Sequence, residues 1–176
     1  MKILIINGAP SSGKSLFCNY ALMYRELVYS YSTIDEVKEL ARLLGWDGVK
    51  DKKGRKFLSD LKDALTEYND LPRKHLEKQI CEKLMECKSL ENNALFLIQM
   101  REPKEIQKWV DLYGAKTLLI KRPDTLKKEW DNHADDEVLN YKYDYELLNT
   151  KTKEDWKEEA IEFIDMVRKE EWESTI

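Results

Sequence analysis

An α/β fold, with a parallel β-sheet covered by helices on both faces, is what the sequence predicts, and two observations carry this prediction. Short apolar runs alternate with longer segments whose apolar residues recur at helical spacing, which is typical of strand–helix–strand units. The first apolar run, at residues 3–6, leads into a glycine-containing string at 8–15 and then into a helix-compatible stretch at 16–27. A strand, a glycine-rich loop and a helix in this order open many folds of this class.

The predicted strands lie at residues 2–7, 27–32, 94–100, 116–121 and 143–148. The helix after the second strand is expected at residues 34–44. Thr33 with Glu36 predicts a capping box at its start, and Gly45 predicts its end.

Two later helices have their own start and stop signals. Pro103 fits the first turn of a helix that follows the third strand, and Gly114 ends that helix. Thr152 with Asp155 opens the last helix. Its buried face is predicted from apolar residues at helical spacing, namely Trp156, Ala160, Phe163 and Val167. We expect these four side chains in the core rather than in a cofactor site.

The composition indicates one domain with one substantial core, because 176 residues with 42% hydrophobic content suffice for it. A net charge of −4 argues against a broad nucleic-acid-binding surface, so no nucleic-acid polymer is expected as a partner. The odd set Cys18, Cys81 and Cys87 lacks paired metal spacing and favours reduced thiols in a cytoplasmic protein. No run approaches the length of a membrane span, and the first apolar run is too short for a signal peptide. The oligomeric state stays open between a monomer and a homodimer.

Residues 8–15 read Gly-Ala-Pro-Ser-Ser-Gly-Lys-Ser, a complete G-x-x-x-x-G-K-S phosphate-binding loop. Gly8 and Gly13 let the backbone curl so that successive N–H groups point into one hollow, where they attract phosphate oxygens. Lys14 adds a mobile positive charge for the β- and γ-phosphates, and the Ser15 hydroxyl suits Mg²⁺. The residues expected to hold a nucleoside triphosphate are Gly8, Ala9, Pro10, Ser11, Ser12, Gly13, Lys14, Ser15 and Leu16.

Two segments do not belong to the bare frame of sheet and helices. Residues 46–90 contain a polar loop at 47–54 and then helical stretches on either side of Pro72. Residues 122–141 lie between the fourth and fifth strands and are rich in charge and amides. Parallel α/β sheets bind ligands at the carboxyl ends of their strands, where such insertions project. We therefore expect the residues that select a substrate in these two segments of a single domain, 1–176.

Further short stretches add to the phosphate-binding loop. They lie at residues 32–38 (STIDEVK), 54–58 (GRKFL), 101–103 (REP), 132–136 (NHADD) and 143–145 (YDY). In combination with the loop, and in this order along the chain, they resemble P-loop kinases of the nucleoside-monophosphate-kinase type. More narrowly, the chain is similar to deoxynucleoside monophosphate kinase-like proteins of phages and bacteria.

The resemblance implies a three-layer P-loop NTPase fold with a five-stranded parallel sheet in the order 2-3-1-4-5. It implies ATP with Mg²⁺ as phosphate donor and a small phosphorylated acceptor, a (deoxy)nucleoside monophosphate, held by the insertion at 46–90. The segment at 122–141 would be a lid, which matters because water left in the site would hydrolyse ATP. The implied activity is transfer of the γ-phosphoryl group from ATP to that acceptor.

Three residues around the first insertion are candidates for acceptor binding. Asp35 is placed to orient the acceptor or hold a Mg²⁺-bound water, or it is an acid favoured in the first turn of a helix by the helix dipole. Arg55 either grips the acceptor phosphate with its forked guanidinium or is a solvated loop residue. Arg73 is a further candidate that a charged helical face also explains.

Arg101 ends the third strand, where the resembled family commonly places a phosphate-binding arginine. Many P-loop enzymes end that strand with an aspartate that helps to hold Mg²⁺, whereas this chain has Gln99 there. The amide can hydrogen-bond a metal-bound water but has no charge. Metal handling would then rest on Ser15 and Asp35.

The segment 122–141 supplies further candidates. Arg122 would stabilise the charge that spreads over the transferred phosphoryl group, although lids of this family usually bring several arginines. His133 either contacts the acceptor or caps a turn. Asn149 and Thr150 follow the fifth strand, where the resembled family packs the adenine base.

Three functional hypotheses remain open. The first is an ATP-dependent kinase for a (deoxy)nucleoside monophosphate, with Lys14, Asp35, Arg101 and Arg122 as the catalytic residues. The second keeps this fold but changes the acceptor to a non-nucleotide phosphorylated metabolite. The third is a catalytically weak ATP-binding regulatory protein, which the uncharged Gln99 motivates.

Overall fold

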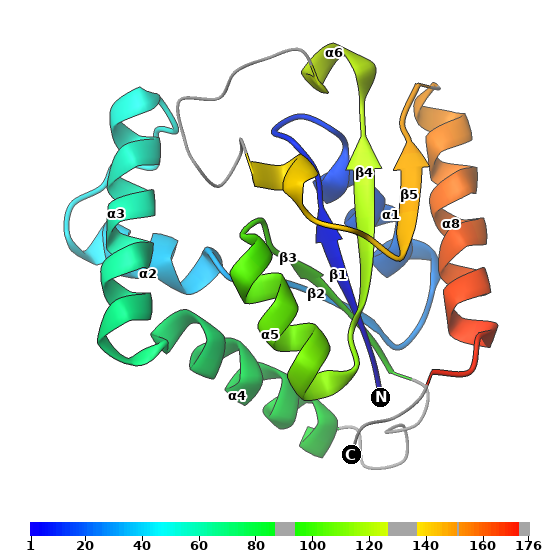
Figure 1. Ribbon diagram of the computed structural model, residues 1–176, viewed down its shortest axis with the longest axis horizontal. Helices are drawn as coiled ribbons and strands as arrows, with labels where there is room; N and C mark the ends of the chain where they lie inside the picture. Colours follow the sequence, from blue (N-terminus) through cyan, green and yellow to red (C-terminus); the bar gives the residue numbers. More distant parts are fainter. Residues whose placement is uncertain (87–93, 127–136, 151, 173–176) are drawn as a thin grey trace. The chain divides into compact units, whose positions relative to one another are not determined.

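The computed structural model describes residues 1–86, 94–126, 137–150 and 152–172 (Figure 1). Its strands are β1 (Lys2–Asn7), β2 (Val28–Ser32), β3 (Leu95–Gln99), β4 (Lys116–Lys121) and β5 (Tyr145–Leu148). They form one sheet in the order β2-β3-β1-β4-β5, and β1 runs parallel to both β3 and β4, as β4 does to β5. The predicted fold class and strand order are therefore confirmed.

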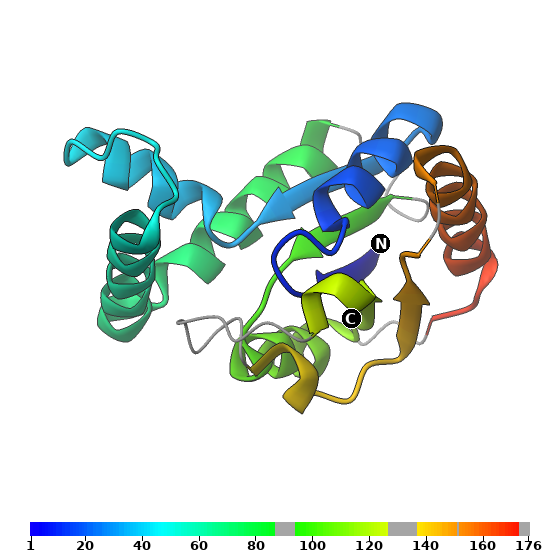
Figure 2. The ribbon, with the colours of Figure 1, turned by 90° about the horizontal axis from the view of Figure 1, so that it is seen from above.

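Helices cover both faces of this sheet. Helices α1 (Lys14–Tyr24) and α8 (Lys153–Lys169) share one core cluster with β1, β3 and β4. Helix α5 (Pro103–Tyr113) lies on the other side, as Figure 2 shows, and buries Ile106 and Trp109. Successive strand residues point to opposite faces, and residues of β1, β3 and β4 are buried on both, which explains the nearly continuous apolar runs in the sequence.

The unit described so far comprises Met1–Ser30 and Leu90–Ile176, and a second compact unit comprises Tyr31–Ser89. The second unit contains helices α2 (Asp35–Leu43), α3 (Lys52–Asn69) and α4 (Leu71–Glu86). Its core is formed by Val37, Ala41 and Leu58, with Ile34, Trp46, Leu61 and Leu65 packed against them. The assignment of residues 46–90 to an acceptor-binding insertion of a single domain stays a prediction.

Several predicted ends differ from the structure. Helix α1 stops at Tyr24 and not at Leu27, because the backbone of Arg25 is already extended, with a φ of −136° and a ψ of 126°. Leu27, with a φ of 60°, belongs to the turn into β2. Strand β5 starts two residues later than predicted, because the Asp144 carboxylate accepts hydrogen bonds from the Thr117 N–H (2.9 Å) and hydroxyl (2.8 Å). At this position the Thr117 N–H therefore donates to the Asp144 side chain and not to a backbone carbonyl of β5.

The cap predictions have mixed outcomes. The capping box of Thr33 and Glu36 is wrong, since α2 begins after Ile34 and has no side-chain cap at its start. The polar loop predicted at 47–54 is shorter, because the Asp51 carboxylate accepts the Gly54 N–H (2.7 Å) and starts α3 at Lys52. The structure confirms Pro103 in the first turn of α5 and Gly114, with a left-handed backbone, at its end. It also confirms Thr152, which accepts the Asp155 N–H and caps α8.

The carboxyl end of α8 is tied to β1. Lys2 on β1 donates to the backbone carbonyls of Val167 (3.2 Å), Arg168 (2.6 Å) and Glu170 (2.6 Å), which caps the carboxyl end of the helix. The predicted core residues Trp156, Ala160, Phe163 and Val167 are all buried. Helix α8 is therefore part of the core and not an appended segment.

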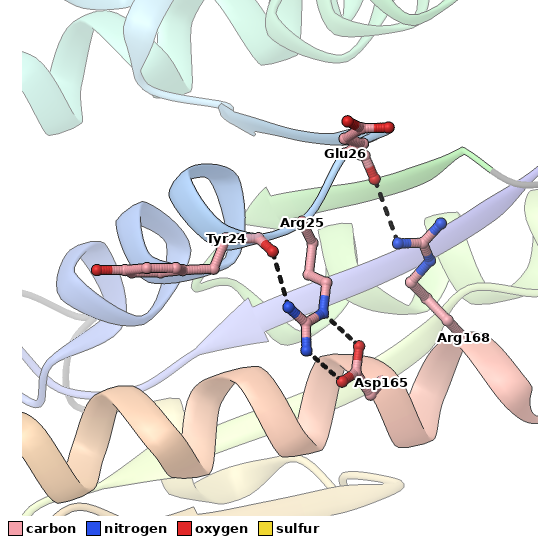
Figure 3. Close-up of polar contacts among 5 residues, drawn as sticks. All are labelled: Tyr24, Arg25, Glu26, Asp165 and Arg168. Atoms are coloured by element: carbon pink, nitrogen blue, oxygen red, sulfur yellow. Dashed lines mark hydrogen bonds and ion pairs between the residues drawn. The ribbon is translucent and has the colours of Figure 1, made fainter.

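A cluster of polar contacts joins α1 to α8 (Figure 3). Arg25, just after α1, donates two hydrogen bonds to the Asp165 carboxylate, and a third from its guanidinium to the Tyr24 carbonyl at 2.8 Å. Arg168 donates to the Glu26 carbonyl at 3.2 Å. These hydrogen bonds from Arg25 hold the pKa of Asp165 below its usual range.

The Arg25–Asp165 pair predicts a pH-dependent contribution to stability. Because the folded-state pKa of Asp165 is lowered, the contribution is complete above about pH 4 and is lost as the pH falls through that lowered value. The side chain of Asp165 is 36% exposed, so solvent screening limits the contribution to about 0.5 kcal/mol. We expect Asp165→Asn to lower the free energy of unfolding by this amount at pH 7.

Urea unfolding at pH 7 and pH 3 measures this effect. The difference between Asp165→Asn and the wild type should shrink at pH 3, and an equal difference at both pH values would contradict the prediction. Glu158→Gln removes an exposed acid from the same helix and controls for the loss of one negative charge.

In the described parts of the chain, no helix is long and apolar enough to cross a membrane. Cys18 is buried and Cys81 exposed, and both are free thiols, whereas Cys87 lies outside the described residues. Burial raises the pKa of the Cys18 thiol to about 11, so this side chain stays protonated.

Candidate functional site

The loop of residues 8–15 joins β1 to α1 at the carboxyl ends of the strands (Figure 1). Three of its residues have positive φ: Gly8 (152°), Ser11 (64°) and Gly13 (104°). Gly13 immediately precedes α1, which has no side-chain cap at its start. A helix start without such a cap presents backbone N–H groups and a partial positive charge to an anion.

Lys14 is buried, and its ammonium group donates hydrogen bonds to the carbonyls of Gly8 and Ala9 (2.8 Å for Ala9). The charge is therefore held directly over the loop. A long flexible side chain can exchange such carbonyls for phosphate oxygens, which are stronger acceptors because they are charged.

The surroundings of the loop explain both of its glycines. A Cβ atom on Gly8 would lie 2.3 Å from the Ile120 carbonyl oxygen and 2.7 Å from Ser12 Oγ. On Gly13 it would lie 2.4 Å from Asn149 Nδ2 and 3.3 Å from Trp156 Nε1. The loop therefore packs against β4 at its start, and at its end against Asn149, which follows β5, and Trp156 of α8.

Asn7, the last residue of β1, links the loop to two other segments. Its Oδ1 accepts the Gly8 N–H at 2.7 Å, and its Nδ2 donates to the Arg101 carbonyl (3.0 Å) and the Tyr143 hydroxyl (2.7 Å). Tyr143 in turn donates to the Val138 carbonyl at 2.8 Å. Our sequence reasoning missed Asn7, although a polar residue at the end of an apolar strand was the available signal.

Burial raises the pKa of Tyr143 above its usual range, more than the hydrogen bond from Asn7 lowers it. The hydroxyl is therefore protonated over the working pH range and acts as a donor to Val138, not as a base. Val138 belongs to a short 3-10 helix, η1 (Glu137–Asn140), within the predicted lid segment. Asn7 thus connects the loop with the end of that segment.

Asn149 supports the other end of the loop. Its Nδ2 donates to the Ser12 carbonyl at 2.9 Å, and the residue is buried. Within the described part of the chain, Ser12 Oγ and Trp156 Nε1 are buried and have no hydrogen-bond partner. Our sequence reasoning placed Asn149 near an adenine base and Trp156 only in the core, so it missed their position beside Gly13.

These features fit a bound phosphate chain. A buried hydroxyl without a partner, two glycines whose Cβ atoms would clash, and a helix start without a side-chain cap are what a phosphate cradle requires. Ser15 is exposed in the first turn of α1, so its hydroxyl is accessible to Mg²⁺. Among the described residues, no group of three or more His, Cys, Asp or Glu could hold a metal ion. The roles of Ser15 and Asp35 toward Mg²⁺ stay predictions.

Both proposed catalytic arginines lie in the same unit as the loop. Arg101 is partly buried just after β3, with its carbonyl held by Asn7, and Gln99 lies beside Ile6 of β1 in the sheet register. Arg122 is exposed after β4, with its Nε 3.7 Å from Asp124 Oδ2. His133 lies outside the described residues, and the roles of all these side chains stay predictions.

Three of the candidates for acceptor binding lie in the unit Tyr31–Ser89. Asp35 is exposed in the first turn of α2 and pairs with Lys38 at 2.7 Å, which matches the helix-dipole alternative. Arg55 is exposed, and its Nε donates to the Lys50 carbonyl at 3.0 Å.

Arg73 has two carboxylate partners within its own unit. It donates to Asp70 at 2.6 Å and to Glu77, and these contacts raise the pKa of its guanidinium. A phosphate would have to compete with both carboxylates, which favours the structural alternative for this residue.

Neither a protein-family model nor a curated protein matches the sequence. Solved structures do match it over nearly the whole chain. Dephospho-CoA kinase from Campylobacter jejuni aligns with a TM-score of 0.50 and 16% identity, covering 94% of this chain and 97% of that one. Shikimate kinase from Aquifex aeolicus aligns with a TM-score of 0.52 and 17% identity, covering 95% and 98%. This is a P-loop α/β fold. At such low identity the likeness establishes the fold of the P-loop protein and not its substrate.

Proposed function

We propose that this protein is an ATP-dependent kinase that transfers the γ-phosphoryl group to a small-molecule acceptor. The observation that carries the proposal is the geometry of the P-loop, with buried Lys14 over a loop whose glycines and helix start are shaped for phosphates. Two of the structures with this fold, dephospho-CoA kinase and shikimate kinase, support it. The cytoplasmic setting expected from the odd set of cysteines is part of this proposal.

In this proposal, ATP supplies the transferred phosphoryl group and Mg²⁺ neutralises part of its charge. The backbone of residues 8–15 binds the phosphates, and Lys14 moves its ammonium from the loop carbonyls to the phosphate oxygens. Arg101 and Arg122 bring further positive charge to the equatorial oxygens. Asn7 keeps the start of the loop and the end of β3 in a fixed relation. Catalysis is then a matter of positioning and charge stabilisation.

For the acceptor we propose a (deoxy)nucleoside monophosphate. The support is the set of short stretches that resemble that type of kinase, including Arg55 in the unit Tyr31–Ser89 and Arg101 after β3. A forked guanidinium suits a phosphate monoester because it donates two parallel hydrogen bonds. The 122–141 segment would close over the reacting groups.

A second candidate acceptor is a small metabolite that is not a nucleoside monophosphate. The specific observation in its favour is that dephospho-CoA kinase and shikimate kinase share the fold over nearly the whole chain. The chemistry at the P-loop would be the same for either acceptor. Only the residues that hold the acceptor would differ.

A phosphoryl-transfer screen tests the function. Purified protein, ATP and Mg²⁺ are incubated with the common ribo- and deoxynucleoside monophosphates, and separately with dephospho-CoA and shikimate, with Lys14→Ala as the control. Products are identified by mass. We expect a new nucleoside diphosphate that the control does not form.

The other outcomes separate the alternatives. A product from dephospho-CoA or shikimate alone would replace the nucleotide acceptor with a metabolite. ATP binding without any product would favour the third hypothesis, a regulatory ATP-binding protein in which Gln99 takes the place of the metal-binding aspartate.

A further inference from the structure

The peptide bond between Ser12 and Gly13 lies at the end of the P-loop, directly before α1. Its carbonyl oxygen accepts the hydrogen bond from Asn149 Nδ2 at 2.9 Å, and the described chain contains no cis peptide bond. In a planar trans peptide, the C=O and N–H groups point in opposite directions. A side chain that holds the Ser12 carbonyl on one side therefore fixes the Gly13 N–H on the other.

Asn149 is itself held in place. Its backbone N–H donates to the Lys121 carbonyl at the end of β4 (2.8 Å), and the residue is 7% exposed. The Asn149 side chain consequently has little freedom to move to another hydrogen-bond partner. The carbonyl of Ser12 is tied through Asn149 to the end of the sheet.

Gly13 shows how closely this support approaches the loop. A Cβ atom there would lie 2.4 Å from Asn149 Nδ2 and 3.3 Å from Trp156 Nε1, and Gly13 has a φ of 104°. Residues outside the loop are thus one reason why position 13 requires glycine. Asn149 and Trp156 together occupy the space that a side chain at position 13 would need.

We propose that Asn149 is a positioning residue that turns the Gly13 N–H toward the phosphates of the donor nucleotide. The proposal rests on the function proposed above, because it assumes that phosphates bind the P-loop. It does not require Asn149 to touch the nucleotide, and this separates it from a role in holding the base.

The test compares Asn149→Leu and Asn149→Ala with the wild type. Leucine keeps a branched side chain of similar size and has no donor, whereas alanine removes the side chain. Binding of ADP and of inorganic tripolyphosphate is measured by titration calorimetry. We expect both variants to bind both ligands about tenfold more weakly, because one favourably oriented donor to a charged group is lost.

Thr117→Val is the matched control. Thr117 is as buried as Asn149 and also donates a side-chain hydrogen bond, to Asp144 at 2.8 Å, but it lies at the opposite end of β4. We expect this variant to keep the affinity of the wild type even if it melts at a lower temperature. Thermal melting of all variants separates a loss of stability from a loss of binding.

Two results would overturn the proposal. One is tripolyphosphate affinity within twofold of the wild type in both variants. The other is a loss for ADP alone, which would mean that Asn149 contacts the nucleoside instead.

A measurement on the wild type adds an independent test, which does not need the variants to fold. The amide resonance of Gly13 should shift when tripolyphosphate saturates the protein, and an unchanged resonance would also overturn the proposal. The kinase function fails separately, through the absence of a phosphorylated product in the transfer screen.

Discussion

In the proposed kinase reaction, Lys14→Ala should lower the rate of phosphoryl transfer by about a thousandfold or more, while the protein still folds. The ammonium group is the positive charge held directly over the P-loop, with the Gly8 and Ala9 carbonyls as partners. In the reaction its partners would be the phosphate oxygens, whose charge spreads in the transition state. Alanine removes that charge and leaves the backbone of the loop intact.

The measurement is the rate of product formation with the acceptor found in the screen, together with the melting temperature. Lys116→Ala is the control, because Lys116 lies at the amino end of β4 and pairs with Asp144 at 3.6 Å. We expect the control to keep the rate of the wild type. A Lys14→Ala protein with more than a tenth of the wild-type rate would contradict the role given to this lysine.

Gly8→Ala should destabilise the unit that contains the P-loop by about 3 kcal/mol or more. Two causes add up, since Gly8 has a φ of 152° and its Cβ atom would lie 2.3 Å from the Ile120 carbonyl oxygen. The clash is with backbone and not with the end of a flexible side chain. For a chain of this length, the melting temperature should fall by about 6–12 °C.

Thermal unfolding followed by circular dichroism measures this effect, and tripolyphosphate binding shows whether the loop still forms. Gly114→Ala is the control, because Gly114 has a left-handed backbone with a φ of 60° at the end of α5, in the same unit. Its cost should be about 1 kcal/mol. An equal loss of stability in both variants would mean that backbone strain alone explains the effect of Gly8→Ala. The contact with the Ile120 carbonyl would then contribute nothing.

The order of the elements was predictable because it depends on signals that are local in the sequence. The motif at 8–15 and the alternation of apolar runs with amphipathic segments led to the observed sheet order through a known family pattern. The ends were less predictable, since they depend on partners from elsewhere. Asp144 shortens β5 through a contact with Thr117, and no property of either residue alone indicates it.

In the candidate site, too, the local motif was predictable and the contacts with distant residues were not. The motif identified the P-loop residues themselves. The residues that support the loop could not be read from it, because Asn149 follows Ser12 by 137 positions. In the sequence, Asn7 only ends an apolar strand and Trp156 only belongs to a stripe of core residues. The fold places Asn7 beside Gly8 and Trp156 beside Gly13.

The position of α8 has a consequence for the order in which the molecule is made on the ribosome. The P-loop and α1 emerge before α8, yet Phe17, Cys18 and Ala21 of α1 share their core with Trp156, Ala160 and other residues of α8. Synthesis from the amino end therefore leaves this face of α1 uncovered until α8 has been translated. The loop that would hold the nucleotide is made well before the helix that supports it.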